Sequence, residues 1–346
     1  MVVLVLGAFF EKILKHLLII TENWVVRAYV EVRWMENIRE KIVVAQKEIE
    51  KVVKGKNDKI QKIIAVILAK GHILLEDVPG VGKTTTALTL SHVMNLRYGR
   101  VQFTPDVLPT DITGFTMYNK QTEKFEYRYG AVMCNLFLAD EINRTSPKTQ
   151  SALLQVMEEG KVTIDRKNFV IPKPFIVIAT QNPTGSTGTQ KLPESQLDRF
   201  MIKISMGYPD RSNEIDILKG EKTDKFKDIN QVLSATEIVK VQEIVEKVFV
   251  NDKIYGYIAD LVSATRNSEY IQTGLSTRAS IALLRLARAY AFIAGRDYCA
   301  PEDVIRSFYD ISGHRILLTG KARMENLSVR QVLDKLREKI DVPALA

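Results

Sequence analysis

Apolar residues along the chain follow two kinds of spacing, which predict helices mixed with buried strands. Between Met35 and Lys70 they recur at helical spacing, and a break at Gly55 predicts two successive helices. Short apolar runs bounded by turn or charged residues predict buried strands. Three of these runs are Ile73–Leu75, Leu136–Glu141 and Phe175–Ala179, and a shorter one is Val101–Phe103. This first part of the chain therefore has the pattern of an α/β core.

Helices and hairpins are predicted between these strands. Lys83–Asn95 and Thr145–Glu159 have helical patterns. Val162–Ile171 alternates around a polar turn, which indicates a hairpin. The segment Thr104–Gly130 combines turn residues with alternating aromatics, so we expect a loop with a short helix and a hairpin.

After Tyr208-Pro209 the patterns become helical, with no strand signal. Ser234 and Glu237 form a capping box at the start of one helix, and Pro301 stands in the first turn of another. We expect a small all-α domain here. The predicted division is an N-terminal extension at 1–34, the α/β core at 35–208, the helical domain at 209–325, and a C-terminal helix and tail at 326–346.

Residues 1–34 fit neither part. The run MVVLVLGAFF is apolar, but Glu11, Lys12 and Lys15 interrupt it before the ~18 to 20 apolar residues of a membrane helix are reached. A signal peptide would need positive charge ahead of the apolar core. Three interpretations stay open: a peripheral membrane or partner-binding segment, an extra element packed on the main domain, or residues upstream of a true start at Met35.

Composition narrows the class of protein only a little. The 346 residues carry a net charge of +8. Two distant cysteines, Cys134 and Cys299, and four scattered histidines form no metal-binding pattern and favour reduced thiols in a cytoplasmic protein. Six lysines between Lys51 and Lys70 face one aspartate. A solvated helix face explains this run better than nucleic-acid binding, because no aromatic residues interleave it.

The stretch ILLEDVPGVGKTTT, residues 73–86, predicts a phosphate-binding loop between a strand and a helix. Backbone N–H groups of such a loop surround nucleotide phosphates, at the positive end of the following helix. We expect the Lys83 ammonium at the terminal phosphates and the Thr84 hydroxyl on Mg²⁺. Asp77 stands where the strict pattern has Gly, while Gly80 still gives the backbone room. The predicted nucleotide contacts of the loop are Gly80, Val81, Gly82, Lys83, Thr84 and Thr85.

Polar residues at the ends of two further strands predict the rest of an ATPase site. Asp140 and Glu141 end the run LFLADE, where phosphate-loop ATPases place a Mg²⁺-binding Asp and a catalytic base. Asn182 follows the next strand and is expected to orient the attacking water, although a turn-capping role before Pro183 is the alternative. Arg199 ends the segment PESQLDRF, where pairing with a surface carboxylate is the simpler interpretation.

Taken together, these stretches resemble the MoxR family of AAA+ ATPases, over about Asn37 to Leu318. The resemblance lies in EDVPGVGKT, RVQFTPDVLPTDITG, LADEINRTSPKTQSALLQVMEEG, PFIVIATQNP, LPESQLDRF, GLSTRAS and GRDYCAPEDV. It implies an AAA+ phosphate-loop core with a parallel sheet in an αβα arrangement, followed by a small all-α lid domain. It also implies ATP and Mg²⁺ as ligands.

The resemblance further implies roles for single residues. Asn182 would be the first sensor, and Arg199 the finger that reaches the ATP of a neighbouring subunit in trans. Arg278 would be the second sensor, contacting the γ-phosphate within its own subunit. Arg144 is a candidate for an inter-subunit contact, with a solvated or salt-bridged role as the alternative. Val53 would lie at the adenine pocket, where the usual Gln is missing from the sequence Val-Lys-Gly-Lys.

The implied function is Mg-dependent ATP hydrolysis by a ring, a hexamer in this family, that remodels, matures or assembles partner proteins. The insert 104–130 and the hairpin 162–171 would face the pore or a partner. A protein with a von Willebrand factor A domain is one implied partner, and attachment to the membrane through residues 1–34 remains open. Two rivals remain: a nucleic-acid motor, and a nucleotide-dependent switch or scaffold. Glu141, Asn182 and Arg199 together argue against the switch.

Overall fold

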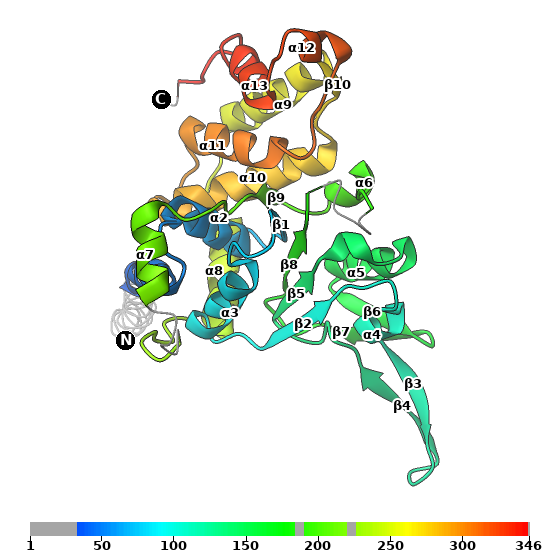
Figure 1. Cartoon of the computed structure of the whole chain (residues 1–346). Helices are drawn as coiled ribbons and strands as arrows, with labels where there is room; N and C mark the ends of the chain where they lie inside the picture. The colour runs from blue at the N-terminus through cyan, green and yellow to red at the C-terminus, as the bar shows by residue number, and fades with distance from the viewer. Residues whose placement is uncertain (1–32, 184–189, 220–225, 345–346) are drawn as a thin grey trace, which may run out of the picture. The chain divides into compact units, whose positions relative to one another are not determined.

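The computed structural model describes residues 33–183, 190–219 and 226–344 (Figure 1). The chain divides into two compact units, residues 1–43 and 44–346. In the first unit the described residues, from 33 onward, are helical, and the extension expected at 1–34 lies almost wholly outside the described residues. Within the described ranges, no helix is long and apolar enough to cross a membrane.

A five-stranded parallel sheet forms the centre of the second unit. In spatial order its strands are β2 (Tyr98–Gln102), β5 (Leu136–Asp140), β8 (Ile176–Gln181), β1 (Ile73–Glu76) and β9 (Ile202–Ile204). Every residue of β5 and β8 is buried, as expected for central strands covered on both faces. The predicted α/β fold is confirmed, and its three apolar runs are the three central strands.

Helices cover both sides of this sheet (Figure 1). On one side lie α2 (Asn57–Leu68) and α3 (Lys83–Val93), and on the other lies α5 (Pro147–Glu159). α5 begins at a Ser146 cap and packs its apolar stripe into the same cluster as Phe137 of β5 and Val177 of β8. These helices fix the ends of the strands that carry the polar residues described below.

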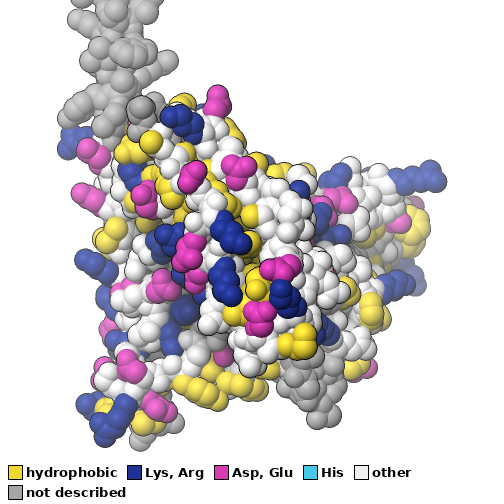
Figure 2. Space-filling view, turned by 90° about the horizontal axis from the view of Figure 1, so that it is seen from above, with side chains coloured by type: hydrophobic (Ala, Val, Ile, Leu, Met, Phe, Trp, Pro, Cys, Tyr) yellow, Lys and Arg dark blue, Asp and Glu magenta, His cyan; other side chains and the backbone are white. Residues whose placement is uncertain are grey.

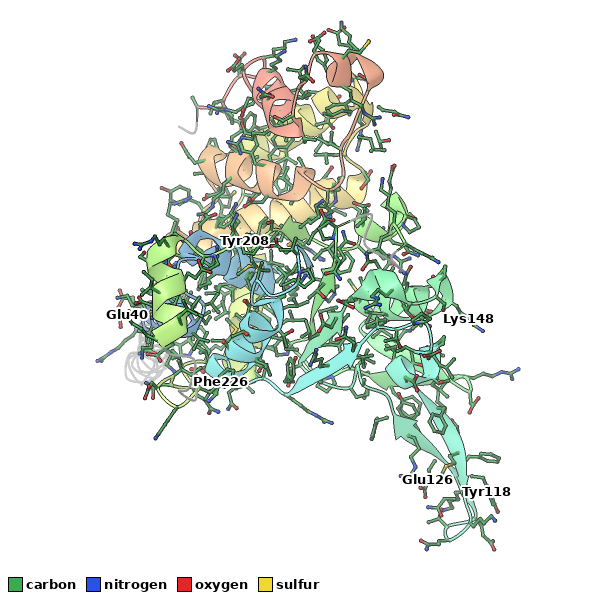
Figure 3. All side chains as sticks on the ribbon, in the orientation of Figure 1. Glu40, Tyr118, Glu126, Lys148, Tyr208 and Phe226 are labelled. Carbon is green, nitrogen blue, oxygen red and sulfur yellow. The ribbon has the colours of Figure 1, made fainter. Side chains whose placement is uncertain are left out.

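Two hairpins project from the core, as predicted. The short helix α4 (Pro109–Thr113) leads into β3 (Gly114–Asn119) and β4 (Lys124–Tyr129), and the second hairpin pairs β6 (Lys161–Ile164) with β7 (Lys167–Val170). The first hairpin extends away from the sheet, with Tyr118 and Glu126 far from the core (Figure 3). Tyr127 stacks on Phe169, with ring centroids 4.0 Å apart, so the two hairpins contact each other near their bases.

The lid that follows is helical, with one correction. Its helices are α7 (Arg211–Lys219), α8 (Ala235–Glu246), α9 (Asp252–Arg266), α10 (Thr277–Ile293), α11 (Pro301–Ser312), α12 (Gly320–Met324) and α13 (Val329–Arg337). The capping box at Ser234 is present. However, β10 (Ile271–Thr273) pairs antiparallel with β11 (Leu317–Leu318), so the prediction of no strand here was wrong. Segments of two or three residues are too short to show alternation.

Candidate nucleotide-binding site

The predicted phosphate loop lies between the end of β1 and the start of α3. Gly80 and Gly82 have positive φ angles of 89° and 85°, which favour glycine. Apart from each glycine and its two chain neighbours, no described residue comes within 4 Å of where a Cβ would stand. Gly82 is also the residue that precedes the first turn of α3. The loop therefore presents open backbone at a helix N-terminus, the geometry that binds phosphate.

Asp77 stands where the strict motif has glycine, and its side chain accepts hydrogen bonds from the chain after β9. Its Oδ2 accepts hydrogen bonds from the Gly207 backbone N–H at 2.8 Å and from the Ser205 hydroxyl at 3.2 Å. The beginning of the loop is thereby tied to the chain that leaves β9. Asp77 is absent from the residues with positive φ, so this position does not need the freedom of glycine.

Lys83 is buried at the bottom of the loop. Its ammonium donates to the carbonyl oxygens of Asp77 at 2.5 Å and Val78 at 3.4 Å, and to Asn182 Oδ1 at 3.3 Å. Burial lowers the pKa of Lys83, while the nearby carboxylates of Asp77, Asp140 and Glu141 act in the opposite direction. The ammonium thus lies between the loop and the acidic strand end, where terminal phosphates would need it.

Asp140 ends β5 with a buried carboxylate. Its Oδ1 accepts a hydrogen bond from the Thr180 hydroxyl at 2.7 Å, and its Oδ2 pairs with Arg100 at 2.7 Å. A carboxylate oriented in this way can hold a hydrated Mg²⁺. No motif in the sequence pointed to Arg100, which lies on the neighbouring strand β2.

Glu141 follows Asp140 in a left-handed backbone conformation, with φ of 57°. Its Oε1 accepts from Asn182 at 2.9 Å, and its Oε2 accepts from Arg144 at 2.8 Å and Gln102 at 3.0 Å. The hydrogen bond from Arg144 lowers the pKa of Glu141; burial opposes this effect, while Asn182 and Gln102 support it. The carboxylate is therefore ionised, as a base that orients water must be. No motif in the sequence pointed to Gln102 either.

The structure brings four predicted site residues into one network. Asn182 is buried at the end of β8 and links Lys83 to Glu141. Its Oδ1 accepts a hydrogen bond from Lys83, and its Nδ2 donates one to Glu141. Asp140 lies one residue before Glu141, and the Thr180 hydroxyl contacts both the Asp140 carboxylate and the Glu141 backbone N–H. Among the other predicted contacts, Val81, Thr84 and Thr85 lie half-buried in the loop and first turn of α3, and Val53 is buried before Gly55.

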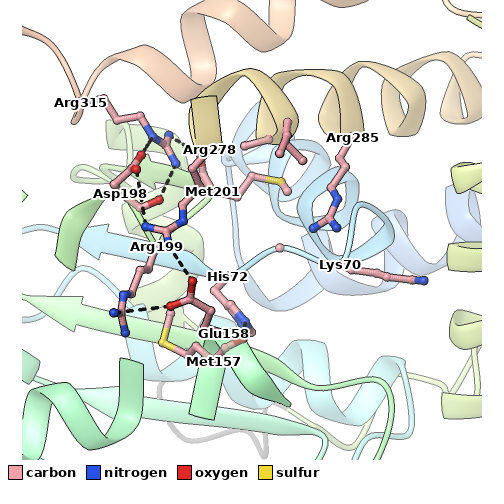
Figure 4. A pocket seen from close by; sticks show the side chains of 13 residues that line it. Lys70, His72, Met157, Glu158, Asp198, Arg199, Met201, Arg278, Arg285 and Arg315 are labelled. Carbon is pink, nitrogen blue, oxygen red and sulfur yellow. Dashed lines mark hydrogen bonds and ion pairs between the residues drawn. The ribbon is translucent and has the colours of Figure 1, made fainter. Parts of the chain in front are cut away.

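Arg199 and Arg278 lie together in a separate, basic pocket (Figure 4). Both guanidinium groups pair with the half-exposed Glu158, Arg278 at 2.6 Å and Arg199 at 3.5 Å. The pocket, of about 390 Å³, is lined by five basic and two acidic side chains. These are Lys70, Arg199, Arg278, Arg285 and Arg315, with Glu158 and Asp198. The excess of positive charge fits an anionic ligand.

The basic pocket and the phosphate loop lie at opposite edges of the sheet. The loop, Asp140 and Asn182 are at the carboxyl ends of β1, β5 and β8, whereas the pocket includes residues 70–72, just before β1. Arg199 likewise precedes β9. Four residues of β1 separate the two edges, a length of about 13 Å. Arg278 is thus placed beside Arg199, and not at the phosphate loop of its own subunit as the resemblance implied.

Comparisons with known proteins agree with this architecture. Residues 72–202 match the "ATPase family associated with various cellular activities (AAA)", and residues 263–336 match the "AAA lid domain". The chain is 43% identical to the protein YeaC of Bacillus subtilis, over 90% of this chain and 97% of that protein. It is 38% identical to the Chaperone MoxR1 of Mycobacterium tuberculosis, over 86% of this chain and 81% of that protein.

The chain belongs to the MoxR family of AAA+ ATPases. A solved structure of an ATPase candidate from Cytophaga hutchinsonii has the same fold, with a TM-score of 0.82 and 38% identity over 91% of this chain and 99% of that one. The resemblance seen in the sequence is therefore confirmed for the family and for the AAA+ core followed by a lid. The roles of the single residues remain predictions that the geometry now makes specific.

Proposed function

We propose that this MoxR-type chain hydrolyses ATP with Mg²⁺ as part of a ring, and uses the turnover to remodel, mature or assemble partner proteins. The observation that carries the proposal is the division of the site between two edges of one sheet. Lys83, Asp140, Glu141 and Asn182 form one network, and the basic pocket lies at the other edge. A head-to-tail ring would bring the pocket of one subunit to the phosphate loop of the next.

The residues at the phosphate loop supply most of the chemistry. The loop N–H groups and Lys83 would hold the triphosphate, and the ionised Glu141 would orient the attacking water, with Asn182 fixing its carboxylate. Thr84 and Asp140 would hold Mg²⁺, and the donor set fits because Mg²⁺ prefers hydroxyl, carboxylate and water oxygens. The metal would supply positive charge to the terminal phosphates.

The basic pocket would supply charge stabilisation in trans. Arg199 Nε is buried and has no hydrogen-bond partner among the described residues, and Glu158 is shared with Arg278. Arg199 thus keeps one N–H that no described group of its own subunit satisfies, and Glu158 holds the two guanidinium groups side by side. We extend the trans role from Arg199 to Arg278, since the two lie side by side. Arg144 pairs with Glu141 of its own subunit, which favours the salt-bridged alternative.

The finer points of the proposal concern partners. One relative is named a chaperone, which supports protein clients. A hexameric ring, a partner with a von Willebrand factor A domain and a cytoplasmic location complete the proposal.

Over the lid face drawn in Figure 2, Lys and Arg side chains alternate with Asp and Glu instead of gathering in one patch. This face therefore offers nucleic acid no continuous basic surface.

The proposal is tested by ATP turnover per subunit, measured against protein concentration. We expect the rate to rise with concentration, because a lone subunit lacks the trans arginines. Lys83→Ala should lose nucleotide binding, and Glu141→Gln should bind ATP with turnover reduced at least about 100-fold. Arg199→Ala should lose about 10³-fold or more in turnover. Arg323→Ala, an exposed arginine on α12, is the matched control and should behave like the wild type.

Two results would contradict the proposal. Turnover that is independent of concentration and insensitive to Arg199→Ala would show that the subunit works alone. No turnover under any condition, with ATP still bound, would favour the nucleotide switch instead.

A further inference from the structure

Arg315 lies between α11 and β11 of the lid, and its side chain is 4% exposed. Its guanidinium uses every one of its five N–H groups. Nε pairs with Asp198 Oδ1 at 2.6 Å. The other four N–H groups donate to the backbone carbonyls of Asp198, Phe200, Met201 and Ile311, at 2.7 to 3.1 Å. Four of the five bonds therefore go from the lid to a single segment of the core, Asp198–Met201.

That segment carries Arg199. Phe200 is fully buried in the core, while Arg199 points into the basic pocket (Figure 4). The lid holds Asp198 from a second element as well, since Ser276, the cap of α10, donates to Asp198 Oδ2 at 2.9 Å. The direction of the Arg199 side chain is thus set by backbone groups that the lid fixes on both sides of it.

We propose that Arg315 is a positioning residue that presents Arg199 to the nucleotide of the neighbouring subunit. This inference rests on the function proposed above. Arg315 has no free donor with which to touch a phosphate itself, so it acts through the segment that it holds. The consequence is specific: loss of Arg315 damages the finger that a subunit donates, and leaves intact the phosphate loop that the same subunit uses.

The matched variants follow from the geometry. Arg315→Gln removes the charge and most of the donors. Arg315→Lys keeps a charge that can reach Asp198 but cannot bridge several carbonyls, because an ammonium lacks the planar fork. Arg296→Gln breaks a different ion pair of the lid, Arg296 with Asp303 at 2.6 Å, that does not contact the Asp198–Met201 segment. It controls for loss of lid stability alone.

The first measurement is steady-state turnover of each full-length variant, with the affinity for a fluorescent ATP analogue measured in parallel. We expect Arg315→Gln to lower kcat about 100-fold, the cost of a misplacement near 1 Å. Arg315→Lys should show a smaller loss, about 10-fold. The nucleotide affinity of both should stay within about threefold of the wild type, since the phosphate loop is untouched. Arg296→Gln should keep its kcat.

The deciding measurement mixes subunits. Lys83→Ala is inactive itself but has an intact Arg199 and Arg315. In equimolar mixed rings, about half of the Arg315→Gln subunits should have a Lys83→Ala neighbour that donates an intact finger. Turnover per Arg315→Gln subunit should therefore recover to about half of the wild-type rate per subunit. If Arg315→Gln does not fold, Arg315→Lys takes its place in the same mixture.

The outcomes separate the two proposals. Recovery with Lys83→Ala supports the positioning role. Failure of Arg315→Gln to recover, where Arg199→Ala does recover with the same partner, overturns this inference and leaves the ring motor standing. Failure of both mixtures overturns the trans arrangement itself, and the inference with it.

Discussion

At the scale of single residues, Asp77 shows how a phosphate-loop motif can lose a glycine and keep its loop geometry. The strict phosphate-loop pattern has Gly at this position for its backbone freedom. Here the backbone does not need a positive φ, and the carboxylate instead fixes Gly207 and Ser205. The residue that breaks the strict sequence pattern thus makes hydrogen bonds that hold the start of the loop to the chain after β9.

This tie leads to a stability prediction. Asp77→Gly should lower the free energy of unfolding by about 1–3 kcal/mol, because two hydrogen bonds to a charged acceptor are lost and glycine is freer in the unfolded chain. Asp77→Asn keeps an oxygen that can accept both bonds, so its loss should be less than about 1 kcal/mol. Urea unfolding of both variants measures the difference. An Asp77→Gly protein as stable as the wild type would refute this account.

Residues on the motifs could be predicted from sequence, whereas their hydrogen-bond partners could not. Lys83, Asp140 and Glu141 each follow an apolar run at a recognisable spacing. Gln102 and Arg100 lie on β2, and only the pairing of β2 with β5, which places Gln102 opposite Asp140, brings them to the acidic pair. Such a register arises from tertiary packing, so no local pattern contains it.

At the scale of elements, His72 joins three of them at the start of β1. Its Nδ1 accepts from the Val177 backbone N–H of β8 at 3.0 Å, and its Nε2 lies 3.1 Å from the Met157 carbonyl oxygen of α5. One ring nitrogen must accept and the other must donate, so the neutral tautomer with hydrogen on Nε2 fits this position. Burial lowers the pKa of His72 from 6.5 to about 4.

A pH dependence of stability follows. The folded pKa lies below the unfolded one, so between pH 6.5 and about 4 the unfolded chain binds more protons than the folded one. The contribution of neutral His72 to the free energy of unfolding is complete above pH 6.5. It is lost as the pH falls toward 4, which lowers the free energy of unfolding by up to about 3 kcal/mol. Unfolding by urea at several pH values measures this slope.

The control for this prediction is His72→Gln. An amide can accept from Val177 and donate to Met157 but cannot titrate, so the variant should lose part of the slope in this window. Wild type and His72→Gln with equal slopes would show that His72 does not contribute.

Long elements were predictable and short ones were not. Helices of eleven residues or more, such as α5 and α10, repeat their apolar stripe often enough to be recognised. β9 has three residues, Ile-Lys-Ile, and β11 has two. Their pairing with β1 and β10 gives them structure that no window of sequence shows. The same limit hid Arg315, because its partners in the segment Asp198–Met201 lie more than a hundred residues away.

At the scale of the whole molecule, the proposed function would make the isolated subunit an incomplete enzyme, because its site is divided between opposed edges of the sheet. The phosphate loop lies at one edge, and Arg199 with Arg278 lies at the other. The resemblance implied a role at the nucleotide for both arginines, in trans for Arg199 and within its own subunit for Arg278. The place of α10, which carries Arg278, depends on how the lid packs and could not be predicted from the sequence. Mixing variants in pairs can test whether each arginine acts in its own subunit or in the neighbouring one.

The last prediction concerns Arg278, whose role in trans or in cis gives opposite results in two mixtures. If Arg278 acts in trans beside Arg199, Arg278→Ala subunits should recover turnover when mixed with Lys83→Ala, which donates both arginines. They should not recover with Arg199→Ala, since every donated pair then lacks one arginine. If Arg278 acted in cis, the mixture with Arg199→Ala would recover and the mixture with Lys83→Ala would not. Because both guanidinium groups contact Glu158, we expect the first pattern, with turnover per mixed ring as the measurement.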